Sequence, residues 1–175
     1  MELRPFGGCC FLWVMKENKF DNEKKKMLGE LQLVLENCSH RLSWHEYFSA
    51  MTLLLAVRSP SPRLRVGAVL VKQNRVISAG YNGFPAGTPH TSVMRDGHEV
   101  NTIHAEQNAI SDAARRGVSI DGATLYVSHF PCIHCTKFAI SSGIQQIYYK
   151  NDYRNDEVVA ELCRLSSVGL ERILS

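Results

Sequence analysis

The sequence lacks the marks of a membrane protein and of a disulfide-rich secreted domain. No apolar run in its 175 residues approaches the roughly 18 needed to span a bilayer. Of its six cysteines, two form a Cys-x-x-Cys pair and the other four follow no pattern. This cysteine usage is typical of a reducing compartment, and we expect a cytoplasmic protein with no membrane partner.

The sequence also has little excess of one charge over the other. The formal net charge is +3, and the one dense basic run is Lys24-Lys25-Lys26. A nucleic-acid-binding surface would favour a basic stripe, and none is visible. We therefore expect no nucleic-acid partner.

The length and the 45% hydrophobic content suit one well-cored domain. We place this domain at residues 41–175 and treat residues 1–40 as an N-terminal extension. The apolar stretch Gly7–Met15 is too short for a secretory signal and has no cleavage site after it. We interpret it as a flexible leader, or as sequence upstream of a true start at Met15 or Met27.

Later in the extension, Met27, Leu28, Leu31 and Leu35 recur at helical spacing. They predict an amphipathic helix that packs on the domain or on a partner subunit.

Beyond residue 40 the chain alternates helical and strand patterns, with no repeat and no internal linker. Ser43, followed three residues later by Glu46, predicts a capping box that opens a helix. Gln73-Asn74 predicts a turn between two strands, and Gly117 and Gly143 predict helix ends. The expected helices are 44–58, 104–116, 132–142 and 156–166, and the expected strands are 66–71, 75–81, 124–128, 146–149 and 170–174. Residues 88–103 are irregular and receive no element. The alternation predicts an α/β layer fold, a hairpin followed by βαβ units.

Two short motifs have the residue types of a catalytic zinc site. The first is His104-Ala105-Glu106, and the second is Pro131-Cys132-Ile133-His134-Cys135. One imidazole and two thiolates make three protein ligands, which leaves the fourth position of a tetrahedral zinc open for water. H-x-E followed by P-C-x-x-C is the signature of zinc deaminases. A closed structural site, completed by His129 or His134, is the alternative.

Glu106 is predicted to act as a proton shuttle and not as a ligand. Zinc bound by one neutral histidine and two thiolates remains acidic enough to activate water near neutral pH. A carboxylate beside that water can take its proton and deliver it to a ring nitrogen and then to leaving ammonia.

Four segments together resemble the deoxycytidylate deaminase family, including its bacterial late-competence members. They are Val-Gly-Ala-Val at 66–69, Gly-Tyr-Asn-Gly-Phe-Pro at 80–85, His-Ala-Glu-Gln-Asn-Ala-Ile at 104–110, and Phe-Pro-Cys-Ile-His-Cys at 130–135. The similarity extends over about residues 42–174. Cytidine deaminases proper differ, because they carry a cysteine in place of the histidine ligand.

The resemblance implies a three-layer α/β/α fold, with a five-stranded mixed sheet between helices on both faces. It implies zinc-dependent hydrolysis of dCMP to dUMP and ammonia, which supplies thymidylate synthesis. It also implies a homohexamer that dCTP with Mg²⁺ activates and dTTP inhibits. The expected effector residues are Tyr81 and Gly83 at a subunit interface, with Arg115, whose alternative role is to stabilise a helix C-terminus.

The resemblance also suggests substrate-binding residues. Arg63, Tyr153 and Arg154 match the family's phosphate contacts, and His98 matches a position near the phosphate. Asn82 could hold the sugar or the base edge through its amide. The alternatives are solvated surface cations for the arginines and a plain Asn-Gly turn for Asn82.

The chain departs from its relatives at a second, structural zinc that some of them carry. Ser61 and Pro62 stand in the region of one expected cysteine, and residues 86–103 contain none. We therefore predict one zinc per chain, although His90 and His98 could belong to another metal site. The alternative functions are deamination of another base, in tRNA or a free nucleoside, and a zinc-stabilised assembly module without activity.

Overall fold

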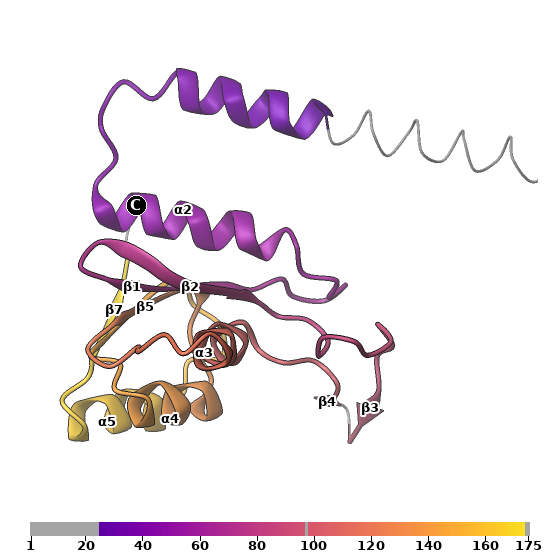
Figure 1. Ribbon diagram of the computed structural model, residues 1–175, viewed down its shortest axis with the longest axis vertical. Helices are drawn as coiled ribbons and strands as arrows, with labels where there is room; N and C mark the ends of the chain where they lie inside the picture. Colours follow the sequence, from indigo (N-terminus) through magenta and orange to yellow (C-terminus); the bar gives the residue numbers. More distant parts are fainter. Residues whose placement is uncertain (1–24, 97, 174–175) are drawn as a thin grey trace, which may run out of the picture. The chain divides into compact units, whose positions relative to one another are not determined.

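A computed structural model describes residues 25–96 and 98–173, with the side chain of His98 excepted. The chain divides into two compact units at Arg41/Leu42, and each unit is described by itself (Figure 1). Gly7–Met15 and Lys24 lie outside the described residues. No helix within the described ranges has both the length and the apolar character needed to span a membrane.

The first unit contains one described helix, over residues 25–36. This agrees with the helical spacing of its apolar residues. Met27, Leu28 and Leu35 are exposed, and Leu31 is half-buried. The partner that the amphipathic pattern predicts for this helix stays a prediction.

The second unit is built on a five-stranded sheet in the order β2-β1-β5-β6-β7. The strands are β1 (Gly67–Lys72), β2 (Arg75–Tyr81), β5 (Thr124–His129), β6 (Gln146–Asn151) and β7 (Gly169–Arg172). β1 pairs antiparallel with β2 and β5, and β5, β6 and β7 are parallel. The expected mixed sheet, a hairpin followed by βαβ units, is confirmed. β7 is the predicted edge strand.

Local sequence explains the first two connections. Gln73 and Asn74 both have positive φ, 51° and 57°, which is the backbone of the tight turns that match hairpin twist. At Ser43 the predicted capping box is present: its side chain accepts from the backbone N–H of Glu46, whose carboxylate accepts from the Ser43 backbone. This helix, α2 (Trp44–Ala56), ends shortly before Pro60.

Helices cover both faces of the sheet (Figure 1). α2 packs on one face, where its Phe48 joins a core cluster with Val69 and Val71 of β1 and Tyr126 of β5. The other face carries α3 (Ala105–Arg115), α4 (Ile133–Ser141) and α5 (Glu157–Leu165). The three-layer α/β/α architecture expected from the resemblance is therefore confirmed.

The approach of α3 to the sheet depends on a glycine. A Cβ atom at Gly80 in β2 would lie 2.4 Å from the carbonyl oxygen of Ala105 and 2.5 Å from the backbone nitrogen of Ala109. Such contacts are shorter than real Cβ atoms make, so only glycine admits the helix this close. Ser78 Oγ donates to Ala109 O at 2.6 Å, and Asn108 Nδ2 donates to Tyr81 O at 2.9 Å. The N-terminus of α3 is thereby fixed over the end of β2.

The region left without an element, residues 88–103, contains a small hairpin. β3 (Met94–Arg95) pairs antiparallel with β4 (His98–Glu99). Two residues per strand give too short a pattern for period-two alternation, so the sequence carries no recognisable strand signal. Gly83 and Ile103 then exchange two backbone hydrogen bonds, which join the end of this region to the loop after β2.

Candidate metal and substrate site

Three donor side chains come together where two helices begin. His104 is the N-cap of α3, Cys132 is the N-cap of α4, and Cys135 lies in the first turn of α4. Their donor atoms all lie within 4.8 Å of one another, and this is the metal-capable group among the described residues. The two motifs predicted from the sequence therefore meet at one point of the tertiary structure.

The spacing of these donors fits a tetrahedral zinc ion. His104 Nδ1 lies 3.5 Å from Cys132 Sγ and 3.3 Å from Cys135 Sγ. Zn–S bonds of about 2.3 Å and Zn–N bonds of about 2.0–2.1 Å at tetrahedral angles set N···S distances of about 3.6 Å. His129 and His134, considered as a fourth ligand, are outside the group, and His134 is exposed.

Hydrogen bonding and helix position favour a thiolate at Cys132. A hydrogen bond from Cys135 and another from His104 lower the pKa of Cys132 to about 3. The hydrogen bond with Cys132, followed by burial, raises the pKa of the Cys135 thiol. The hydrogen bond to Cys132 also raises the pKa of His104. Free N–H groups at the helix N-terminus add a favourable field for negative sulfur.

Glu106 lies beside this group and is almost fully buried, with 4% of its surface exposed. Burial raises the pKa of its carboxyl group, and the charge of His104 opposes that rise. A hydrogen bond connects its side chain with Cys135. A buried carboxyl next to the donors, with its affinity for a proton increased, has the properties of a general acid–base group.

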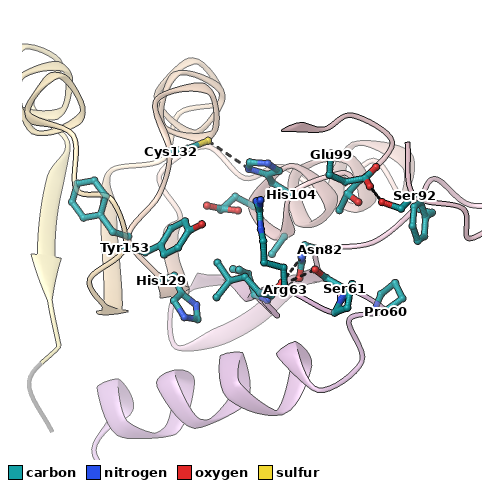
Figure 2. A pocket seen from close by; sticks show the side chains of 18 of the residues that line it. Pro60, Ser61, Arg63, Asn82, Ser92, Glu99, His104, His129, Cys132 and Tyr153 are labelled. Carbon is teal, nitrogen blue, oxygen red and sulfur yellow. Dashed lines mark hydrogen bonds between the residues drawn. The ribbon is translucent and has the colours of Figure 1, made fainter. Parts of the chain in front are cut away.

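A cavity of about 270 Å³ opens from the donor group. This volume is close to the lower end of small-molecule sites. Arg63, Asn82, Tyr153 and Glu106 line it, together with His104 and Cys132. The cavity is shown in Figure 2, with Arg63 reaching inward from the loop before β1. No hydrogen bond or ion pair within the described ranges occupies this guanidinium group, so it is available to an anionic ligand.

Asn82 is engaged by the protein itself. Its Oδ1 accepts from Val66 N at 2.7 Å, and its Nδ2 donates to Leu64 O at 2.9 Å. Both amide atoms thus hold the chain that leads into β1. Its predicted contact with the sugar or the base stays a prediction, for which one amide hydrogen remains.

Other predicted site residues do not line the cavity. Arg154 lies outside it, with its guanidinium carbon 5.6 Å from the centroid of the Tyr153 ring. Tyr81 and Gly83 flank Asn82 without reaching it, and Arg115 is exposed in the last turn of α3. For His98 the structure gives the backbone, in β4, and its side chain lies outside the described part.

The β3–β4 region forms a cavity wall that the sequence did not reveal. Glu99 holds this wall together: its carboxylate accepts from Ser92 Oγ, from Val93 N at 3.2 Å and from Asn101 N at 2.8 Å. Ser92, Met94 and Glu99 all line the cavity. They reach the cavity because the segment 88–103 folds back on itself, and no sequence motif predicts that fold.

His129 and Phe130 also line the cavity, and the substrate prediction did not include them. A signal for them existed. They follow the predicted strand 124–128, and ligands in open α/β sheets collect at the carboxyl ends of strands.

Comparisons with known proteins agree with this geometry. Residues 42–151 match the family described as the cytidine and deoxycytidylate deaminase zinc-binding region. The chain is 45% identical over 137 residues to ComE operon protein 2 of Bacillus subtilis, which covers 76% of this chain and 72% of that protein. It is 36% identical over 146 residues to a probable deoxycytidylate deaminase of Drosophila melanogaster, and the match covers 74% of this chain and 71% of that protein.

Among solved structures, the dCMP deaminase of cyanophage S-TIM5 in complex with dCMP and dUMP superposes with a TM-score of 0.69. It is 31% identical, and the match covers 77% of this chain and 99% of that chain.

Proposed function

The chain belongs to the cytidine and deoxycytidylate deaminase family, and from this premise we propose that it hydrolyses dCMP to dUMP and ammonia. The observation that carries the proposal is a His/Cys/Cys donor group with a buried glutamate at one end of a cavity. The relatives named deoxycytidylate deaminase and the nucleotide-bound phage enzyme support dCMP as the substrate.

In this proposal His104, Cys132 and Cys135 hold one zinc ion per chain. Zinc with three protein ligands supplies an acidified water as the nucleophile near neutral pH. Glu106 would take a proton from the attacking water, whose oxygen bonds to C4 of cytosine, and would pass that proton to N3 of the ring. It then transfers the second proton of the water to the leaving amino group, which departs as ammonia and leaves the C4 carbonyl of uracil.

The substrate's other end is assigned to the cations and donors that face the cavity. Arg63 and Tyr153 are proposed to bind the 5′-phosphate, and charge-assisted hydrogen bonds to phosphate are the strong ones. Arg154, outside the lining, and His98 are proposed as outer contacts near the phosphate. Asn82 is proposed to hold the wall of the sugar site while its remaining amide hydrogen faces the ligand.

We also propose that residues 41–175 form the catalytic domain of a homohexamer, and that dUMP from this reaction supplies thymidylate synthesis. Activation by dCTP with Mg²⁺ and inhibition by dTTP would act at a subunit interface near Tyr81 and Gly83, with Arg115 as a further effector contact. The resemblance in the Gly-Tyr-Asn-Gly segment supports this part of the proposal.

One experiment tests both parts. Ammonia release is measured from dCMP, CMP, deoxycytidine and a tRNA anticodon stem, each with and without dCTP and Mg²⁺. We expect turnover of dCMP above the other three. Preference for the tRNA stem or for the free nucleoside would replace the proposed substrate, and no turnover with zinc bound would indicate an assembly module. Equal dCMP rates with and without dCTP would remove the proposed activation alone.

A further inference from the structure

His129 lies at the carboxyl end of β5, where the sheet opens into the cavity. Its partner in the parallel register is Asn151, the last residue of β6, and Tyr153 follows two residues later. Phe130 N donates to Asn151 O at 2.8 Å, and Asn151 Nδ2 donates to Ser128 O at 2.9 Å. The ends of the two strands are thereby fixed together, and His129 has a defined position in the cavity wall.

A short hydrogen-bond chain determines which ring nitrogen of His129 carries the proton. Gly67 N lies 3.1 Å from Ser128 Oγ, and Ser128 Oγ lies 3.0 Å from His129 Nδ1. The backbone N–H of Gly67 can only donate, so the Ser128 hydroxyl oxygen accepts from it. Ser128 is fully buried, and Nδ1 is the one acceptor beside its hydroxyl within the described residues.

The hydroxyl hydrogen of Ser128 therefore goes to Nδ1. The opposite arrangement, with Nδ1–H donating, would leave that buried hydrogen without an acceptor, which proteins strongly disfavour. Since Nδ1 accepts, the neutral ring carries its hydrogen on Nε2. Burial lowers the pKa of His129, which is consistent with a neutral ring.

The Nε2–H group is left with no protein partner in the described part of the chain, in a side chain that lines the cavity. Figure 2 shows His129 at the end of the cavity away from His104 and Cys132, with the Tyr153 hydroxyl directed inward. The rings of His129 and Tyr153 meet edge to face, with centroids 6.3 Å apart. Arg63 extends from the loop before β1, and in this view its side chain runs toward His104.

These groups can donate hydrogen bonds, and the arginine and the Nε2–H group can only donate. Their natural ligand is a group that only accepts, such as a phosphate dianion, and not a hydroxyl. A nucleotide whose base reacts at the donor group of α3 and α4 extends its phosphate toward the other end of the cavity. The donors of His129 and Tyr153, which lie on that side, therefore match the phosphate.

Resting on the proposed function, we propose that His129 is a specificity-determining residue that donates its Nε2–H to the 5′-phosphate of dCMP. Ser128 is then a positioning residue, because its hydroxyl fixes the tautomer. His129 thus joins Arg63 and Tyr153 in selecting a nucleotide over a nucleoside.

The test uses the full-length zinc-loaded chain and two substitutions. His129→Phe keeps an aromatic ring and removes the donor, whereas His129→Gln keeps an N–H at nearly the Nε2 position. We expect His129→Phe to raise KM for dCMP roughly ten- to hundredfold, the loss typical of a hydrogen bond to a charged group, with kcat within about threefold. We expect His129→Gln to stay within about threefold of the unmodified enzyme in KM.

A matched pair of competitive inhibitors separates the phosphate from the rest of the ligand. In His129→Phe the Ki of dUMP should rise as KM does, and the Ki of deoxyuridine should stay unchanged. Equal losses for both inhibitors, or no loss for dUMP, would overturn the inference. Absence of dCMP turnover in the unmodified enzyme would instead overturn the proposed function, and the inference with it.

The tautomer of His129 can be measured directly by NMR. The ¹⁵N NMR shifts of His129 should show an unprotonated Nδ1 and a protonated Nε2. Ser128→Ala should reduce the population of this tautomer. A protonated Nδ1 in the unmodified protein would contradict the hydrogen-bond chain on which the inference depends.

Discussion

At the scale of single residues, Glu106 and Arg63 have contrasting environments in one cavity. Glu106 is a carboxyl group enclosed by protein, and burial raises its pKa above the usual range. Arg63 is exposed and has no ion-pair partner in the described part of the chain. The environment of Glu106 suits a group that exchanges protons, and the environment of Arg63 suits a group that binds an anion.

Replacing the buried carboxyl should separate chemistry from metal binding. We expect Glu106→Gln to keep its zinc and to lose roughly 10²- to 10⁴-fold in kcat, the contribution typical of a positioned acid–base group. Metal content and steady-state rates on dCMP check this. Glu161→Gln, an exposed change on α5, serves as the control. A Glu106→Gln variant with a near-normal rate would show that another group moves the proton.

The two arginines near the cavity should differ in strength. Arg63→Ala should raise KM for dCMP about tenfold or more, because its guanidinium faces the cavity without a protein partner. Arg154→Ala should have a smaller effect of the same kind, because its side chain lies over Tyr153 outside the lining. Neither change should alter the Ki of deoxyuridine. Equal effects of either change on dUMP and deoxyuridine would remove that arginine from the phosphate site.

At the scale of elements, the position of α3 on β2 determines where His104 and Glu106 stand. His104 is the N-cap of the helix, and the first turn lies over Gly80, where there is no room for a side chain. The hydrogen bonds from Ser78 and Asn108 fix its height and rotation. The position of the site thus depends on how closely the backbone of α3 approaches Gly80 in β2.

A methyl group at Gly80 should lower the stability of the fold and disturb the metal site. We expect Gly80→Ala to lower the free energy of unfolding by about 2–3 kcal/mol, since the added Cβ collides with helix backbone and not with a flexible side chain. Zinc affinity should fall as well. Urea unfolding and zinc titration measure the two effects.

Gly29→Ala is the matched control, because a Cβ there meets no atom within 4 Å. It lies in the helix over residues 25–36 and should be neutral or stabilising by up to about 1 kcal/mol. If Gly80→Ala were as well tolerated as Gly29→Ala, the close approach of α3 would not be needed.

At the scale of the whole molecule, the donor group brings together two segments that are distant along the chain. The two halves of the donor group are separated along the chain by α3, a loop and β5, and α4 begins at the second half. A metal ion at the junction would link α3 and α4, and its binding energy would add to folding stability.

Removing the metal should therefore destabilise the protein as well as inactivate it. At a free zinc concentration about 1,000 times Kd, zinc should stabilise the fold by about 4 kcal/mol, or roughly 8–16 °C in Tm. Thermal unfolding with and without a chelator measures this shift, and native mass spectrometry should find one zinc per chain. A second equivalent that resists dialysis, or an unchanged Tm after chelation, would contradict the single linking site.

The sequence by itself determined the order and type of nearly every element in the domain. Helical and strand periodicity, the capping box at Ser43, the turn at Gln73-Asn74 and the glycines at 117 and 143 are local signals, because each is set by neighbours within about four residues. The metal motifs were equally readable, since their residue types and short spacings carry the chemistry.

Only the tertiary structure decided which residues share the cavity. The wall from Ser92 to Glu99 is held by contacts within an irregular loop, and Asn82 proved to be engaged by backbone on both sides of its amide. The tautomer of His129 is fixed by Gly67, which is distant along the chain and donates its backbone N–H to the Ser128 hydroxyl beside Nδ1. Such contacts arise from strand register and loop closure, which act between residues distant in sequence and leave no local pattern to read.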